Sequence, residues 1–328
     1  EPSKRNPRQM FFYRPRVFDF PAQTKQLPDG KTISVRRTVK LFSIGAISIS
    51  VRVPFCVSSL DELVAYHDLR FADTTLEQDI YDLAESVRRD LEPYCVRPVP
   101  AITQAEAYTV FCLNNLPPIQ EGDGSSAEQW LKSNRRQIAA LLTQEENAAN
   151  LADQEISEST QVSVSYYKND LVVVDWDSAI AVGKGTLIDD VLHIMELANV
   201  QLVELAAYDR ILDDSLQLSY KDISQLRFSS SRDVHKRLRE IRIDLSRLSD
   251  ELSNITKFFG DWHLAQIHGN LANRFHLGEW HRIIEEKLRM LGDLYQILQQ
   301  DKTNFLMLVL ETTIVLLFII DLILLFFD

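Results

Sequence analysis

The hydrophobic pattern of the chain is strongest in its last stretch, residues 305–327. Only Glu311, Thr312, Thr313 and Asp321 are not apolar there. A bilayer core about 30 Å thick needs roughly 20 apolar helical residues, because each adds about 1.5 Å. Core helices of soluble proteins are rarely apolar all round over six turns, and this stretch has no polar face. The pattern therefore predicts one transmembrane helix over residues 305–327, with the lipid bilayer as its partner.

Two acids interrupt this apolar span. Glu311 and Asp321 are separated by ten residues, which is about 15 Å along a helix and roughly 80° around it. A carboxylate at the centre of a bilayer costs about 2.5–3.5 kcal/mol. Two interpretations stay open: the acids face a partner helix or an ion path, or they mark the boundaries of the membrane.

The pattern over residues 31–185 predicts an α/β head domain. Residues 47–55 alternate apolar and polar side chains, which indicates a strand within 31–55. Ser59 with Glu62, and Thr75 with Gln78, have the spacing of capping boxes that open helices. The second of these helices would span residues 76–91 and end before Pro93.

The sequence pattern in the second half of the head predicts further strands. Residues 107–113 form one strand, and a helix begins at Ser126. Residues 162–166 and 171–176 flank a turn, which is typical of a hairpin. The all-apolar run 171–174 indicates burial on both faces. Residues 179–182 would add a third strand.

The chain becomes helical over residues 186–304, which predicts a stalk. One stripe steps by three and four residues, as in a coiled coil, so it is a candidate seam for a homo-oligomer. Its members are Val191, Met195, Ala198, Leu202 and Leu205. Asp209 interrupts this stripe. A further helix from residue 281 would run into the membrane span without a break.

These elements predict an α+β fold. A basic and aromatic arm, residues 1–30, precedes a mixed α/β head. A long, coiled-coil-like helical stalk and one C-terminal transmembrane helix follow. We expect the aromatic side chains of the arm to pack on the chain's own head.

The net charge and the cysteines limit which functions and compartments are compatible with the sequence. The formal net charge of −12 argues against broad nucleic-acid binding, which requires a basic surface. The three cysteines match no metal or redox spacing, which favours a reducing compartment. Lys287, Arg289 and Lys302 precede the span, so the positive-inside rule places the bulk of the chain in the cytoplasm or the mitochondrial matrix.

Candidate chemistry in the sequence is sparse. His263, His268, His276 and His281 lack the spacing of zinc-binding helices and are expected on the surface or in connectors. Asp175 and Asp177 follow a buried strand, which suits either a metal or catalytic site or a hairpin edge in water. Residues 183–186 lack the first glycine of a phosphate-binding loop, and Thr186 is expected to cap a helix. We therefore predict a protein without enzymatic activity, cofactor or metal.

The order of these parts resembles a known family. A strand pair is followed by residues 197–205, Leu-Ala-Asn-Val-Gln-Leu-Val-Glu-Leu, on a long helix. Lys287-Leu288-Arg289 and Leu294-Tyr295 then precede an apolar helix that contains Glu311. Over residues 162–327 this layout resembles the "required for meiotic nuclear division" family of membrane-anchored proteins. The resemblance implies a role in holding mitochondrial ribosomes at the inner membrane.

Two functions are compatible with the sequence. The first is a membrane-tethered scaffold whose stalk self-associates and whose head binds a protein or ribosome. The alternative is a subunit of an oligomeric ion-conducting assembly, with Glu311 and Asp321 lining a pore. The layout loosely resembles CorA-type magnesium channels, but their Gly-Met-Asn signature and second span are missing.

Overall fold

The computed structural model describes residues 15–42, 44–95, 98–102, 105–114, 126–183, 185–224, 239, 243 and 262–327. The chain is of the α+β class and forms two compact units. The first contains residues 1–204 and 253–277, and the second contains residues 205–252 and 278–328. The division lies inside a helix, whereas the sequence placed the boundary between head and stalk at residue 185.

The first sheet is built around one long strand, β3 (Thr32–Leu41). β1 (Arg16–Asp19) and β2 (Gln23–Gln26) pair with its two halves, and β4 (Ile47–Arg52) pairs with its other side, all antiparallel. The segment predicted as strand over residues 31–55 is thus a hairpin. It turns near Gly45, whose φ of 94° suits glycine. The described part of the N-terminal arm pairs as strands, and its Phe18 stays 49% exposed.

The predicted helix over residues 76–91 is confirmed as α1 (Leu76–Leu91). The side chain of Thr75 accepts a hydrogen bond from the backbone nitrogen of Gln78 at 3.2 Å. A short 3-10 turn, η3 (Glu92–Tyr94), follows. The capping box predicted at Ser59 is wrong. The residues that follow form a 3-10 turn, η2 (Asp61–Tyr66), which begins after Leu60 and has no side-chain cap.

The second sheet has the order β5-β8-β7-β6. β6 (Ser163–Val164), β7 (Leu171–Val174) and β8 (Ser178–Val182) are antiparallel neighbours, and β5 (Thr109–Leu113) runs parallel to β8. Every residue of β7 and β8 is buried. The predicted hairpin, the third strand and the two-sided burial of residues 171–174 are therefore confirmed.

Helices cover both faces of this sheet. α2 (Ala127–Ser133) and α3 (Arg135–Leu142) share one core with alternate residues of β7 and β8. The intervening residues point to the opposite face, because side chains alternate along a strand. There α7 (Trp262–Arg274) contacts β7. A short 3-10 turn, η4 (Ala148–Asn150), and the helix α4 (Asp153–Ser159) lie between α3 and β6 in the chain.

The first half of α5 (Thr186–Ser224) is tied to both α7 and the first sheet. Buried His268 of α7 donates from Nε2 to Oε1 of Gln201 at 3.0 Å. Glu196 pairs with Lys40 and accepts a hydrogen bond from Ser48 at 2.6 Å. Burial raises the pKa of Glu196, but hydrogen bonds from His193, Lys40 and Ser48 outweigh this and lower it to about 2.

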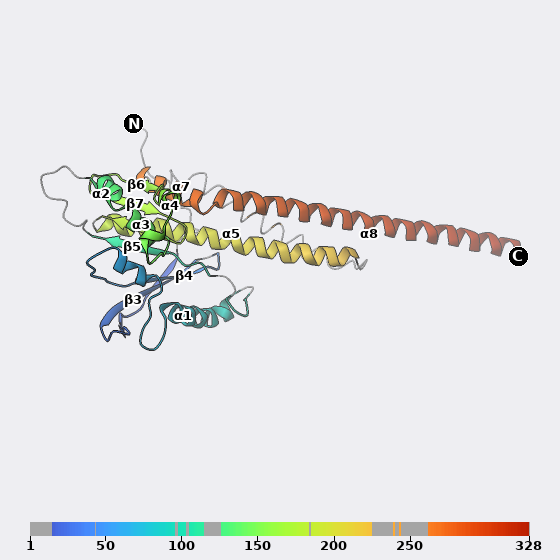
Figure 1. Cartoon of the computed structure of the whole chain (residues 1–328). Helices are drawn as coiled ribbons and strands as arrows, with labels where there is room; N and C mark the ends of the chain where they lie inside the picture. Colours follow the sequence, from blue (N-terminus) through green and yellow to red (C-terminus); the bar gives the residue numbers. More distant parts are fainter. Residues whose placement is uncertain are drawn as a thin grey trace, which may run out of the picture. The chain divides into compact units, whose positions relative to one another are not determined.

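The second unit is built from the rest of α5 and from α8 (Leu277–Phe327). Lys287 of α8 donates to Asp209 at 2.7 Å and to Asp213 at 2.6 Å, so the two helices lie side by side (Figure 1). The apolar contact consists of fully or nearly fully buried side chains: Leu205, Leu212, Ile284, Leu288 and Leu291. Asp209, the residue that interrupts the stripe in the sequence, is therefore matched by a lysine of the same chain.

α8 runs without a break for 51 residues, about 75 Å at a rise of about 1.5 Å per residue. The predicted continuous helix from residue 281 to residue 327 is confirmed. Gly292 lies inside it and does not end it. The packed part of α8 and its apolar part are thus one element (Figure 1).

We expect the first unit to lose stability as the pH falls from 6.5 towards 4. Burial lowers the pKa of His268 from 6.5 to about 4. Between these values the unfolded chain binds a proton that the folded chain does not, so the free energy of unfolding drops. Burial also lowers the pKa of His67 and adds to the effect. Urea unfolding of wild type and His268→Gln at pH 7.5 and 4.5 tests this.

The His268→Gln variant should show a smaller loss between the two pH values than wild type. His276 lies exposed at the surface, so His276→Gln is a matched control for removal of an imidazole. An equal loss in wild type and His268→Gln would contradict the assignment.

Candidate functional site

The apolar half of α8 carries a dense run of exposed hydrophobic side chains. The segment Thr303–Ile320 has a mean hydropathy of 2.2, and none of it is buried by the rest of the described chain. It is the one helix in the described ranges that is long and apolar enough to cross a membrane. Exposed apolar patches of this extent are rare on soluble monomers. The segment therefore fits a membrane anchor.

The polar groups of this segment have different environments. Thr312 and Thr313 donate their hydroxyls to the carbonyls of Leu308 and Val309, each at 2.7 Å. Glu311 is exposed and has no hydrogen bond or ion pair with any described residue. Asp321 belongs to the helix, but its side chain lies outside the described part of the structure.

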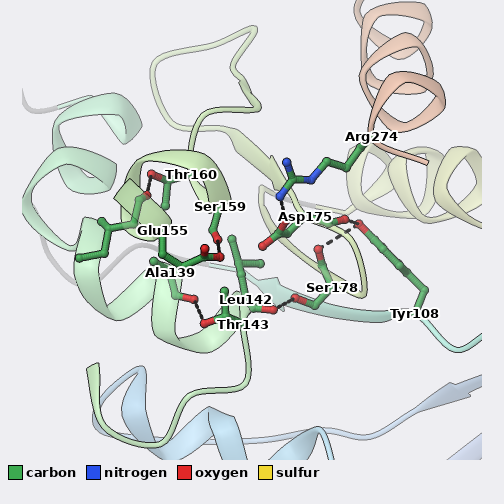
Figure 2. A network of polar contacts seen from close by, with 11 residues as sticks. Tyr108, Ala139, Leu142, Thr143, Glu155, Ser159, Thr160, Asp175, Ser178 and Arg274 are labelled. Atoms are coloured by element: carbon green, nitrogen blue, oxygen red, sulfur yellow. Dashed lines mark hydrogen bonds and ion pairs between the residues drawn. The ribbon is translucent and has the colours of Figure 1, made fainter. Parts of the chain in front are cut away.

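A polar network fastens the end of α7 to the turn between β7 and β8 (Figure 2). Arg274, the last residue of α7, pairs with buried Asp175. The hydroxyl of Tyr108 lies 3.1 Å from the carbonyl oxygen of Asp175 and 3.0 Å from that of Ser178, and donates to them. Ser178 donates to the carbonyl of Leu142 at 2.8 Å. Burial, reinforced by the charge of Asp175, raises the pKa of Tyr108.

This network gives Asp175 a role that neither interpretation of Asp175 and Asp177 included. Asp175 is neutralised by Arg274 and does not converge with other acids, while Asp177 is exposed. No group of three or more His, Cys, Asp or Glu side chains in the described ranges is placed to hold a metal. Asp175 therefore acts as a structural partner that positions α7. Sequence reasoning missed this role because Arg274 is 99 residues away.

Exposed aromatic residues surround α7, and we call them the α7 aromatics: Tyr166, Tyr167, Trp176 and Trp262. They are 49–72% exposed. The rings of Tyr166 and Tyr167 meet edge to face at 4.7 Å, and Tyr166 also contacts His263 at 5.4 Å. The guanidinium of Arg274 lies 5.3 Å from the Trp176 ring, and His276 lies 5.1 Å from it. Tyrosine and tryptophan are enriched where proteins bind other proteins.

The predicted oligomer seam lies inside the chain. Val191, Met195, Ala198 and Leu205 are at most 1% exposed, and Leu202 is half-buried. Four of these five side chains are covered by their own chain, so they are not free to contact a second copy. A period of three and four residues is shared by coiled-coil seams and by helices that face a core, so the pattern alone did not separate them.

The structure also corrects two local expectations. His263 and His268 are 4% and 1% exposed, so the prediction that they lie on the surface is wrong. His268 bonds Gln201 of α5, and His263 contacts the Tyr166 ring. α5 begins at Thr186 as its first helical residue, with Gly185 before it at a φ of 53°. Thr186 is therefore inside the helix.

Comparison with known proteins assigns residues 1–186 to a family. A family model described as "Uncharacterized protein MJ0711, N-terminal domain" matches residues 1–186. The chain belongs to this family. The matched segment contains both sheets and ends at the first residue of α5.

The chain is also similar to a full-length relative. Uncharacterized protein MJ0711 of Methanocaldococcus jannaschii is 26% identical over 220 residues, which are 67% of this chain and 65% of the relative. The chain thus matches just under two thirds of that relative's length. No solved structure matches the chain significantly.

We expect Arg274→Met to destabilise the first unit by about 3–5 kcal/mol, because it leaves the buried charge of Asp175 unpaired. The exposed pair between Arg70 and Asp68 is a matched control, and Arg70→Met should cost no more than about 1 kcal/mol. Chemical denaturation measures both. Adding Asp175→Asn to Arg274→Met should recover part of the lost stability. If Arg274→Met cost no more stability than Arg70→Met, the structural role of the pair would be contradicted.

Proposed function

We propose that the protein is a membrane-tethered scaffold whose α+β head binds a partner. The observation that carries this proposal is the apolar segment Thr303–Ile320, which the rest of the described chain leaves entirely uncovered. In water such a surface would expose apolar area at a cost of roughly 25 cal/mol per Å². A bilayer removes that cost, and the helix satisfies its backbone hydrogen bonds internally.

The charges around the span suggest its orientation. Lys287, Arg289 and Lys302 precede the apolar segment on α8. Basic residues near a span stay on the cytoplasmic side of a membrane. The head would therefore face the cytoplasm, or the matrix in a mitochondrion.

The pairing of α5 with α8 supports a stalk-like role for the second unit. Buried leucines and isoleucine recur on both helices, and Lys287 binds Asp209 and Asp213 beside them. This arrangement favours a short coiled-coil-like pair within one chain.

We propose the α7 aromatics as the surface that binds the partner. Large aromatic side chains provide most of the binding free energy in many interfaces, and arginine often accompanies them. Trp176 with Arg274 is such a combination. The resemblance over residues 162–327 suggests a ribosome as the partner that is held at the membrane.

Removal of residues 303–328 should release the protein from membranes, because the head carries no other described apolar helix of that length. Extraction of membranes with alkaline carbonate tests this. The full chain should stay in the pellet and the truncated chain should move to the supernatant.

A full-length variant tests membrane insertion without removing any residues from the chain. Leu316→Arg with Leu317→Arg adds about 2.5–3.5 kcal/mol per arginine near the centre of the span and should also weaken insertion. Gln296→Arg, on α8 before the span, is the matched control and should remain in the pellet. A wild-type chain that carbonate extracts would overturn the anchor.

Vesicles that carry the full chain should capture purified ribosomes in a flotation assay. Replacement of Trp176 and Trp262 by alanine should reduce capture at least tenfold, since loss of one hot-spot residue costs about 2 kcal/mol or more. Tyr94→Ala is the matched control, because Tyr94 is 84% exposed and is not one of the α7 aromatics. Equal capture by vesicles with and without the protein would contradict ribosome tethering.

A further inference from the structure

We propose that Glu311 joins two copies of this chain inside the bilayer, through one stripe of α8. This inference rests on the proposed membrane anchor. It replaces the self-association that the sequence suggested along Val191 to Leu205, whose side chains are largely buried in their own chain.

The position of Glu311 makes a partner necessary. The apolar span over residues 305–327 has its midpoint at residue 316, so Glu311 lies about 7.5 Å from the centre. The hydrocarbon half-thickness is about 15 Å, which places the carboxyl group inside the hydrocarbon. A polar group there is costly unless it has a hydrogen-bonding partner.

The helix itself supplies no such partner. The neighbours of Glu311 at three and four residues are all apolar: Met307, Leu308, Ile314 and Val315. The adjacent hydroxyls of Thr312 and Thr313 are already donated to backbone carbonyls. Glu311 has no bond to any residue in the described part of the chain, so its partner comes from another molecule.

A second copy of the chain fits this requirement best. An uncharged carboxylic acid has one donor and an acceptor oxygen, so two such groups are complementary to each other. Two copies that cross the membrane in the same direction place Glu311 at the same depth. Polar side chains of this kind hydrogen-bond across helices in membranes.

The residues around Glu311 define the stripe. Asn304 and Phe318 are seven residues before and after it, within about 20° on the helix surface. Both are exposed on α8. A polar residue at heptad spacing selects one register between paired helices, as asparagine does in coiled coils. Asp321 lies roughly 80° away and falls outside this stripe.

The test measures association of the full chain in phosphatidylcholine vesicles by energy transfer between donor-labelled and acceptor-labelled copies, over a series of protein-to-lipid ratios. Glu311→Leu should weaken association about three- to thirty-fold, the range of one interhelical hydrogen bond. Glu311→Gln keeps a donor and an acceptor and should stay within about three-fold of wild type. Thr313→Val should leave association unchanged, because Thr313 lies about 160° from Glu311.

The outcomes separate this inference from the anchor. Flotation of the vesicles is measured first, and a wild-type chain that does not float overturns the anchor and the pairing together. Floating chains in which Glu311→Leu associates as strongly as wild type overturn only the pairing. Glu311→Gln as weak as Glu311→Leu also overturns it, since a hydrogen-bond donor and acceptor at this position would then not support the pairing.

Discussion

The structure of the head depends on the burial of β7 and β8 on both faces. A strand pair without an exposed face requires cover from two sides. α2 and α3, close by in the chain, provide one cover. α7 contributes to the other, although it begins at Trp262, far beyond the sheet in sequence. The chain therefore leaves the sheet along α5 and returns to it, which makes the head discontinuous in sequence.

Charged and polar groups hold these distant segments at defined places. Asp175 with Arg274 ties the end of α7 to a strand turn, and Gln201 with His268 ties its middle to α5. A buried charge without a partner is costly, so separating these segments would leave a charge uncompensated. The ion pair between Lys40 and Glu196 joins α5 to the first sheet in the same way.

The second unit combines two environments in one helix. The first part of α8 buries Ile284, Leu288 and Leu291, and the later part exposes an apolar surface all round. Because α8 is continuous, no loop separates the packed segment from the exposed one. A membrane anchor built in this way would transmit its orientation directly to the packed segment. The proposed scaffold function and the proposed pairing through Glu311 both rely on that continuity.

The sequence alone determined the features that depend on local pattern. The helix α1 with its Thr75 cap, the all-buried strand β7 and the apolar half of α8 were predictable, because periodicity and composition specify them. The role of Asp175 was not predictable, since its partner Arg274 is 99 residues away. The burial of Val191, Met195 and Ala198 was likewise decided by tertiary structure, because a stripe of apolar residues does not identify what covers it. Local chemistry set which segments are strands, helices or apolar span, and only long-range packing decided which charges meet and which faces remain exposed.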